Sequence, residues 1–225
     1  MGIISIEQSG RLYWLGRYTE RVFTTLKCYR TYFDTMLDRA PDAYRDFLLR
    51  LTLPDVYADE GDFTVRYLYD ANNPDSILSN LTRAYDNAIV LREALSTDMM
   101  GYIQMALDQM QAAVAGESPL YALQPVIDSI YAFWGAAGDY MDDESRDLME
   151  CGRRLERLDL YLRLDYNYRD IEWEFSRFQF ALGCLRVPHD TEAAGLLADY
   201  ISQGSDRRLI DRRAVDCLER TLCLG

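Results

Sequence analysis

Histidine is nearly absent from this 225-residue chain, which contains only His189. Ferritin-like di-iron bundles need two Glu-x-x-His pairs, and Ser–His, Cys–His and His-based zinc sites each need a well-placed imidazole. His189 stands beside Pro188 in a segment that we expect to be a loop. The chain is therefore a poor candidate for these metal-dependent and nucleophilic chemistries, and we predict no metal site.

Phosphate-binding glycine patterns, paired cysteines and long apolar runs are also missing. Neither G-x-x-x-x-G-K-[ST] nor G-x-G-x-x-G occurs, so we expect no nucleotide loop and no cofactor. The five cysteines have no C-x-x-C spacing and are interpreted as thiols rather than as a zinc or disulfide framework. No apolar run reaches the roughly 20 residues of a transmembrane helix, and Met1 to Gln8 has no signal-peptide pattern. We expect a cytoplasmic protein with no membrane segment.

Positive charge is in deficit, because the formal net charge is −13. Proteins that bind nucleic acid or anionic lipid need a basic surface to displace counterions. The basic pairs Arg207-Arg208 and Arg212-Arg213 are short and flanked by acids. We therefore expect no nucleic-acid partner, whereas a basic protein partner and any oligomeric state stay open.

Apolar residues recur at spacings of three, four and seven along most of the chain, which is the helical period. The segment 63–69 would also suit a strand, but no partner strand exists for it, so we predict helix there. No linker or low-complexity tract divides the chain. We predict an all-α fold: one domain over 1–225 and a single helical bundle of about eight to ten helices.

Prolines and caps set several expected helix bounds. A long N-terminal helix should begin near Ile6 and stop before Pro41, since the residue before proline avoids helical geometry. Asparagine before Pro74 should cap another helix that runs to about Leu95. The remaining expected helices cover 42–51, 99–115, 120–141, 143–166, 171–184, 191–201 and 206–222.

One six-residue pattern, G-R-x-x-E-R, occurs twice, each time in a predicted helix. A glycine inside a helix costs roughly 1 kcal/mol relative to alanine, so we expect both glycines to admit another backbone, side chain or ligand. Arginines four residues apart repel unless an anion lies between them, and a glutamate of the same or the partner helix is the expected counter-charge. The apolar stripe keeps one phase against both copies, which allows a pseudo-two-fold relation. The copies contain Gly16, Arg17, Glu20 and Arg21, then Gly152, Arg153, Glu156 and Arg157.

Two interpretations of the repeat stay open: a buried Arg–Glu network that fixes the register of the bundle, or a pocket that binds an anion or a carboxylate. A third Arg–Glu element, Arg92-Glu93, closes the helix that begins near Pro74. We expect the three elements to converge on one polar centre. Tyr13 and Trp14 border the first copy and are candidate neighbours of that site.

Four strings of the sequence together resemble a known family. They are Ser9-x-x-Leu12-Tyr13-Trp14-Leu15-Gly16-Arg17-Tyr18-x-Glu20-Arg21, Asn72-Asn73-Pro74-x-Ser76-Ile77, Asn87-Ala88 with Leu91-Arg92-Glu93, and Gly152-Arg153-x-x-Glu156-Arg157. The chain resembles the bacterial alpha-E domain over essentially its whole length. Members of that family typically accompany circularly permuted ATP-grasp ligase-like proteins, and often transglutaminase-like or Ntn-hydrolase proteins.

The resemblance implies a role beside an amide-bond-forming system, by association only. We expect a non-catalytic or co-catalytic partner of an ATP-grasp-type amide ligase, which binds an anionic peptide or intermediate at the Arg/Glu centre. Glu20 and Glu156 would orient that ligand or accept a proton. Two alternatives stay open: an independent enzyme that acts on small amides with one of these glutamates as base, and a purely structural interaction bundle.

Overall fold

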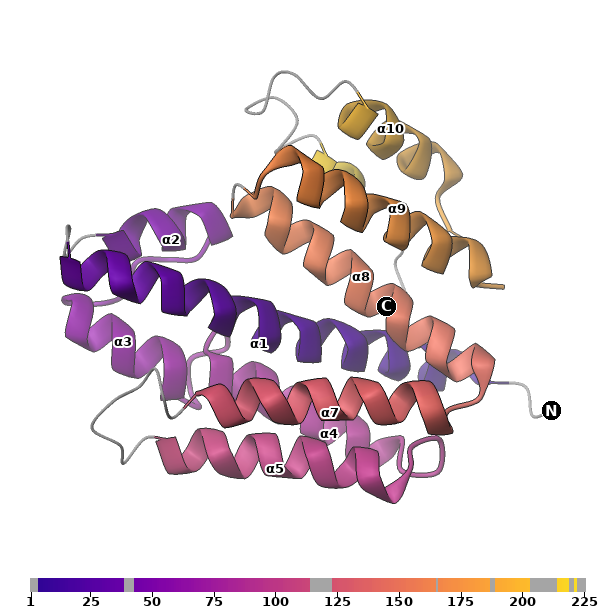
Figure 1. Cartoon of the computed structure of the whole chain (residues 1–225), viewed down its shortest axis with the longest axis horizontal. Coiled ribbons are helices and arrows are strands. Elements are labelled where there is room, and N and C mark those ends of the chain that lie inside the picture. The colour runs from indigo at the N-terminus through magenta and orange to yellow at the C-terminus, as the bar shows by residue number, and fades with distance from the viewer. Residues whose placement is uncertain are drawn as a thin grey trace.

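The helix α1, Ile6–Asp38, crosses the middle of the molecule (Figure 1). The computed structural model describes residues 4–38, 43–113, 123–164, 166–186, 189–202, 214–218 and 221. Within these residues every regular element is a helix, so the all-α prediction is confirmed. The other helices are α2 (Ala43–Leu51), α3 (Glu60–Tyr69), α4 (Ile77–Val90), α5 (Thr97–Ala113), α7 (Gln124–Tyr140), α8 (Asp143–Arg163), α9 (Tyr168–Cys184) and α10 (Thr191–Ser202).

Side-chain caps set several helix starts. The Oδ1 of Asp142 accepts a hydrogen bond at 3.0 Å from the backbone N–H of Ser145, so α8 begins where the sequence predicted. Asn167 caps α9 in the same way. The segment 63–69 is helical within α3, as predicted.

The helix predicted over 74–95 is shorter at both ends. Ser76 is the N-cap of α4, and its Oγ accepts a hydrogen bond at 3.0 Å from the backbone N–H three residues on. Asn73 instead closes the turn before the helix, because its Oδ1 accepts from the backbone N–H two residues on. After Val90 the chain turns at Leu91, whose carbonyl oxygen accepts from the N–H of Ala94 at 2.8 Å. The residues around Pro74 therefore form a turn, and α4 begins at Ile77, after the Ser76 cap.

Two other predictions fall partly outside the described residues. The predicted helix over 120–141 begins in that region, and the part that is described is α7. Most of the predicted helix over 206–222 also lies there, although residues 214–218 are helical. A single domain over 1–225 stays a prediction.

The helix α8 lies between two apolar cores. One core lies among α1 to α5 and α7, and the second is formed by α8, α9, α10 and residues 214–218. Figure 1 shows α8 crossing α1 in roughly the same chain direction, with α9 and then α10 on its far side. Polar side chains of α8 are therefore buried on more than one face. In the part of the chain that is described, no helix combines the length and apolar character needed to cross a membrane.

Candidate functional site

The two repeat glycines mark the point where α1 and α8 touch by their backbones. A Cβ atom on Gly16 would lie 2.0 Å from the carbonyl oxygen of Met149, and one on Gly152 would lie 2.1 Å from that of Tyr13. Each of these oxygens belongs to the residue three positions before the other glycine, so exchanging the two motifs exchanges the two contacts. Only glycine leaves room for such an approach. The predicted close approach is confirmed, and the approaching group is backbone.

The glutamate of the second motif is held by both arginines of the first. Glu156 accepts hydrogen bonds from the Nε of Arg17 at 2.6 Å and from the Nε of Arg21 at 2.5 Å. Its side chain is 0% exposed. Burial alone would raise the pKa of Glu156, but Arg21 and Arg17 outweigh burial and lower it to about 2. We call these three residues the Glu156 half of the network.

The reciprocal arrangement forms around the glutamate of the first motif. Glu20 accepts hydrogen bonds from the Nε and Nη2 of Arg157 at 2.7 and 2.6 Å, and from the Nε of Arg153 at 3.3 Å. The hydroxyl of Thr24 also donates to Glu20, at 2.5 Å. The counter-charge of each arginine pair is therefore the glutamate of the partner helix, and the pseudo-two-fold relation holds for the ion pairs. We call Glu20, Arg153 and Arg157 the Glu20 half.

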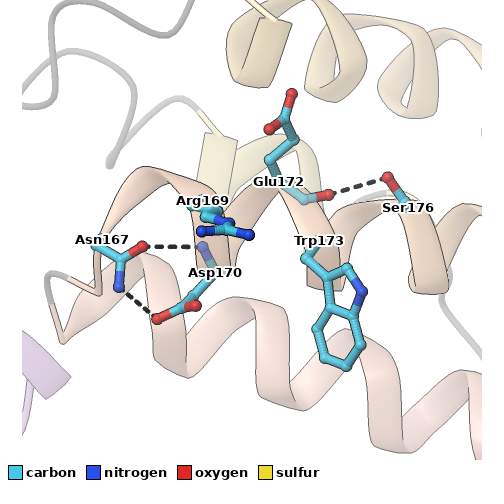
Figure 2. A pocket seen from close by; sticks show the side chains of 6 residues that line it. All are labelled: Asn167, Arg169, Asp170, Glu172, Trp173 and Ser176. Atoms are coloured by element: carbon cyan, nitrogen blue, oxygen red, sulfur yellow. Dashed lines mark hydrogen bonds between the residues drawn. The ribbon is translucent and has the colours of Figure 1, made fainter.

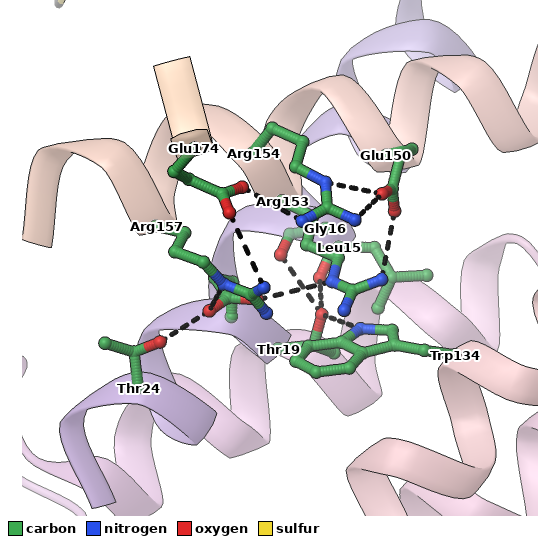
Figure 3. A network of polar contacts seen from close by, with 11 residues as sticks. Leu15, Gly16, Thr19, Thr24, Trp134, Glu150, Arg153, Arg154, Arg157 and Glu174 are labelled. Carbon is green, nitrogen blue, oxygen red and sulfur yellow. Dashed lines mark hydrogen bonds and ion pairs between the residues drawn. The ribbon is translucent and has the colours of Figure 1, made fainter. Parts of the chain in front are cut away.

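Further charged side chains extend the Glu20 half (Figure 3). Arg154 pairs with Glu150 at 2.5 Å and with the buried Glu174 of α9 at 2.9 Å. Glu150 also pairs with Arg153 at 3.1 Å, and Glu174 lies 3.9 Å from Arg157. Each arginine here contacts two carboxylates. Arg17 and Arg21, in contrast, form ion pairs with one carboxylate only among the described residues.

Aromatic rings fill the space beside the Glu20 half. The ring of Trp134 lies 3.6 Å below the guanidinium of Arg153, its Nε1 donates to the hydroxyl of Thr19 at 3.3 Å, and it packs edge-on against Phe23. When the two motifs are aligned, Phe23 of α1 corresponds to Asp159 of α8. A carboxylate thus occupies, in the Glu156 half, the position that a large ring occupies in the Glu20 half.

A cavity of about 160 Å³ borders the Glu156 half. Its walls come from α1, α3, α4 and α8 and from the chain around the end of α2. The side chain of Arg21 is 34% exposed, whereas that of Arg157, its counterpart in the Glu20 half, is 11% exposed. The polar and charged residues that line the cavity include Arg17, Arg21, Asp75, Asn80, Glu156, Asp159 and Arg163.

The wall that α4 contributes carries an unused hydrogen-bond acceptor. Asn80 is 2% exposed, and its Nδ2 donates to the carbonyl oxygen of Ser76 at 2.8 Å, which fixes the orientation of the amide. Its Oδ1 has no hydrogen-bond partner among the described residues. Buried polar atoms are almost always paired in folded proteins. This unpaired acceptor is therefore an unusual feature of a residue that lines the cavity.

A comparison with protein families identifies the fold that carries this network. The family model named Alpha-E, a predicted alpha-helical domain with a conserved ER motif, matches residues 9–184. Within these residues the Glu-Arg dipeptide occurs at Glu20-Arg21 and at Glu156-Arg157. The chain belongs to the Alpha-E family. Searches of curated proteins and of solved structures returned no significant match. In this Alpha-E domain, both ER glutamates join α1 to α8.

Strained backbone lies next to the cavity of the Alpha-E domain. Thr52 has a φ of 59°, a left-handed conformation that is rare for a β-branched residue, and it stands between two leucines that line the cavity. Arg163 donates to the hydroxyl of Thr52 at 2.6 Å and to Asp159 at 2.8 Å. Burial raises the pKa of Asp159, and the charge of Glu156 raises it further. The cavity is therefore bordered by a strained turn and by a carboxylate that resists ionisation.

The predicted third element does not join the network. Arg92 and Glu93 are exposed in the turn that follows α4. Glu93 borders a groove with residues from the starts of α1 and α8, rather than the cavity beside Glu156. The predicted convergence of three Arg–Glu elements is wrong, because α4 ends at Val90 and the chain leaves the helix before reaching this pair.

The two aromatic residues that border the first motif do lie beside the network. The guanidinium of Arg17 is 4.8 Å from the ring of Trp14 and 5.8 Å from that of Tyr13. Tyr13 is 1% exposed, and burial raises its pKa to about 12. These rings hold Arg17 in place and shield its charge from water.

Several residues of the site were not predicted from the sequence. Asp159 and Arg163 lie three and seven positions after Glu156, a helical spacing that places them on its face and that would have found them. Asp75 and Asn80 have no comparable signal, because α4 and the turn before it reach the cavity through tertiary packing. The same holds for Glu174, which reaches the network from α9.

Larger hollows occur elsewhere. One of about 360 Å³ between α8 and α9 is bordered by Arg154, which already pairs with two carboxylates. The hollow at the start of α9, about 860 Å³, is lined by residues of α9 and its cap (Figure 2). Its hydrogen bonds serve the helix itself: Asn167 caps the first turn, and the hydroxyl of Ser176 donates to the carbonyl oxygen of Glu172 at 3.0 Å. A groove of about 960 Å³ between the starts of α1 and α8 is lined by exposed acids such as Asp143 and Glu144. The cavity beside Glu156 is therefore the stronger candidate site.

Proposed function

We propose that this Alpha-E domain is a non-catalytic or co-catalytic partner of an ATP-grasp-type amide ligase, and that it binds an anionic peptide or intermediate beside the Glu156 half. One observation carries the proposal. Arg17 and Arg21 share a single carboxylate and border a cavity, whereas each arginine of the Glu20 half contacts two carboxylates. A ligand carboxylate would supply the missing contact, which arginine makes strongly.

Glu156 is suited to orienting the arginines rather than to abstracting a proton. Both of its oxygens accept hydrogen bonds from guanidinium groups, and its pKa is lowered to about 2. An efficient general base has a pKa near the working pH. Glu20 is also 0% exposed and accepts from three side chains. This arrangement favours binding over independent catalysis.

The ligase assignment rests on the family, whose members typically accompany ATP-grasp ligase-like proteins. The sequence has no phosphate-binding glycine loop, so nucleotide binding is assigned to the partner. The Alpha-E domain then contributes the charged cavity, which positions the anionic end of a substrate while the ligase forms the amide bond.

A tagged chain expressed in its native organism tests the proposal. We expect an ATP-grasp-type ligase to co-purify with the wild type, and ATP-dependent amide formation by that ligase to fall at least tenfold when the Alpha-E gene is deleted. Complementation with Arg21→Gln should fail, whereas Arg92→Gln, an exposed arginine outside the network, should restore activity. Recovery of no ligase, together with unchanged amide formation in the deletion strain, would overturn the proposal.

A further inference from the structure

The cavity beside the Glu156 half has two chemically different walls. Arg17 and Arg21 reach it from α1, and their only ion-pair partner among the described residues is Glu156. On the side of α4 it is lined by Asn80 and, just before the helix, by Asp75. The helix α8 adds Glu156, Asp159 and Arg163 between them. A ligand therefore meets the arginines of α1 on one side and hydrogen-bond acceptors on the side of α4.

The pseudo-two-fold relation shows where a ligand carboxylate would lie. In the Glu20 half, Glu174 lies 3.9 Å from Arg157, next to the pair that Arg157 makes with Glu20. The counterpart of Arg157 is Arg21, which forms no second ion pair among the described residues, although the charge of Asp159 also acts on it. The side chain of Arg21 lines the cavity. A bound carboxylate beside Arg21 would therefore repeat the contact that Glu174 makes with Arg157.

The opposite wall calls for a donor. The Oδ1 of Asn80 is buried and accepts no hydrogen bond from a described residue, and its amide cannot be reversed without losing the bond to Ser76. The carboxylate of Asp75 is half-buried and makes no ion pair or side-chain hydrogen bond with a described residue. An ammonium group has three donors and one positive charge, so its chemistry matches both a carboxylate and an amide oxygen.

The volume limits how much of a ligand can enter. The cavity measures about 160 Å³. Pockets for drug-sized ligands begin near 300 Å³. The cavity therefore suits a small head group rather than a nucleotide or a folded peptide.

We infer that the cavity binds an α-amino-carboxylate head group, in which one carbon carries both a carboxylate, held by Arg21, and an ammonium, held by Asp75 and Asn80. The inference rests on the proposed function and narrows its anionic peptide or intermediate to a zwitterionic end. Such a head occurs in a free amino acid and at the end of a larger amide-bearing molecule. In both cases it is a component that an amide ligase joins.

Titrations of the ¹⁵N-labelled full chain, followed by NMR, test the inference with three matched probes. L-alanine carries both charged groups, propionate lacks the ammonium, and L-alaninamide lacks the carboxylate. We expect L-alanine to bind at least about tenfold more tightly than either analogue, because each analogue loses one charge-assisted contact. The shifts should include the side-chain amide of Asn80. Nε-acetyl-L-lysine distinguishes the two sources: binding as tight as that of L-alanine assigns the site to a larger molecule, and weaker binding assigns it to a small amino acid.

Variants separate the two walls. Asp75→Asn should lower the affinity for L-alanine to that for propionate and leave the affinity for propionate unchanged or higher. Arg21→Gln should weaken both ligands, and Arg92→Gln should weaken neither. Because Arg21 supports the fold, its variant is compared only if its spectrum stays dispersed; Asp75→Asn tests the inference independently, since Asp75 lies outside the network.

The results distinguish the inference from the proposed function. If propionate binds as tightly as L-alanine, or if Asp75→Asn weakens both equally, the zwitterionic assignment is overturned and the anion site stands. If L-alaninamide binds as tightly as L-alanine, or if no probe shifts the residues around the cavity, both the assignment and the anion site are overturned.

Discussion

The helix crossing at Gly16 and Gly152 makes a quantitative prediction about the stability of the domain. An alanine Cβ at either position would lie 2.0 or 2.1 Å from a backbone carbonyl oxygen, whereas real Cβ contacts essentially never fall below 3.0 Å. Relief of the clash requires α1 and α8 to separate by about 1 Å or more, because backbone cannot rotate away as a side chain can. Both halves of the ion-pair network span this crossing and would be stretched together.

Three contributions set the expected loss in the free energy of unfolding. Overpacking of a well-packed interface costs about 1–3 kcal/mol. Breaking a buried ion pair completely costs about 3–5 kcal/mol. Alanine returns up to about 1 kcal/mol of helix propensity. We expect Gly16→Ala to lower the free energy of unfolding by at least about 3 kcal/mol, which for a chain of this size is about 6–12 °C in melting temperature.

Urea denaturation followed by circular dichroism measures this loss. Gly152→Ala should cost a similar amount, and the double variant should cost less than the sum, because one displacement relieves both clashes. Gly135→Ala in α7 is the matched control: nothing lies within 4 Å of its Cβ position, so it should be neutral or stabilising by up to about 1 kcal/mol. If Gly16→Ala melted at the temperature of Gly135→Ala, the backbone contact between α1 and α8 would be refuted.

The remaining predictions concern charge and thiol exposure. Glu156→Gln should lower the free energy of unfolding by about 3–5 kcal/mol at pH 7, because two arginines would face a neutral amide. Burial raises the pKa of Glu156, but the two arginines lower it by more, so that the pKa falls to about 2. The ionised Glu156 therefore stabilises the fold above pH 4.5, and this contribution is lost as the pH falls toward 2. Urea titrations across that window should show a steeper loss for the wild type than for the variant, and parallel curves would contradict the ion pairs. Arg92→Gln should change stability by less than about 0.5 kcal/mol, and a loss above about 1 kcal/mol would mean that Arg92 belongs to the network. A thiol reagent should modify exposed Cys184 in the native protein but spare buried Cys151, whose pKa burial raises to about 12. Equal modification rates by mass spectrometry would contradict that burial.

Local signals in the sequence predicted most helices. Apolar spacing located α8, and the lack of a partner strand identified 63–69 as helix. The prediction failed around Pro74 and Leu95, where several residues compete for the same cap or turn. There the choice depends on hydrogen bonds of comparable strength, such as those accepted by Asn73 and Ser76.

The repeated motif by itself determined that its arginines would meet a glutamate of the motif. Glycines in helix interiors indicated a close approach, and paired arginines indicated a carboxylate from the same or the partner helix, because both features are otherwise destabilising. Only the tertiary structure decided that the two halves differ. Phe23 and Trp134 fill one half, whereas Asp159 and a wall from α4 leave a cavity at the other. The residues that make this difference lie on helices far apart in the sequence, so their meeting depends on how the helices pack and not on any local pattern.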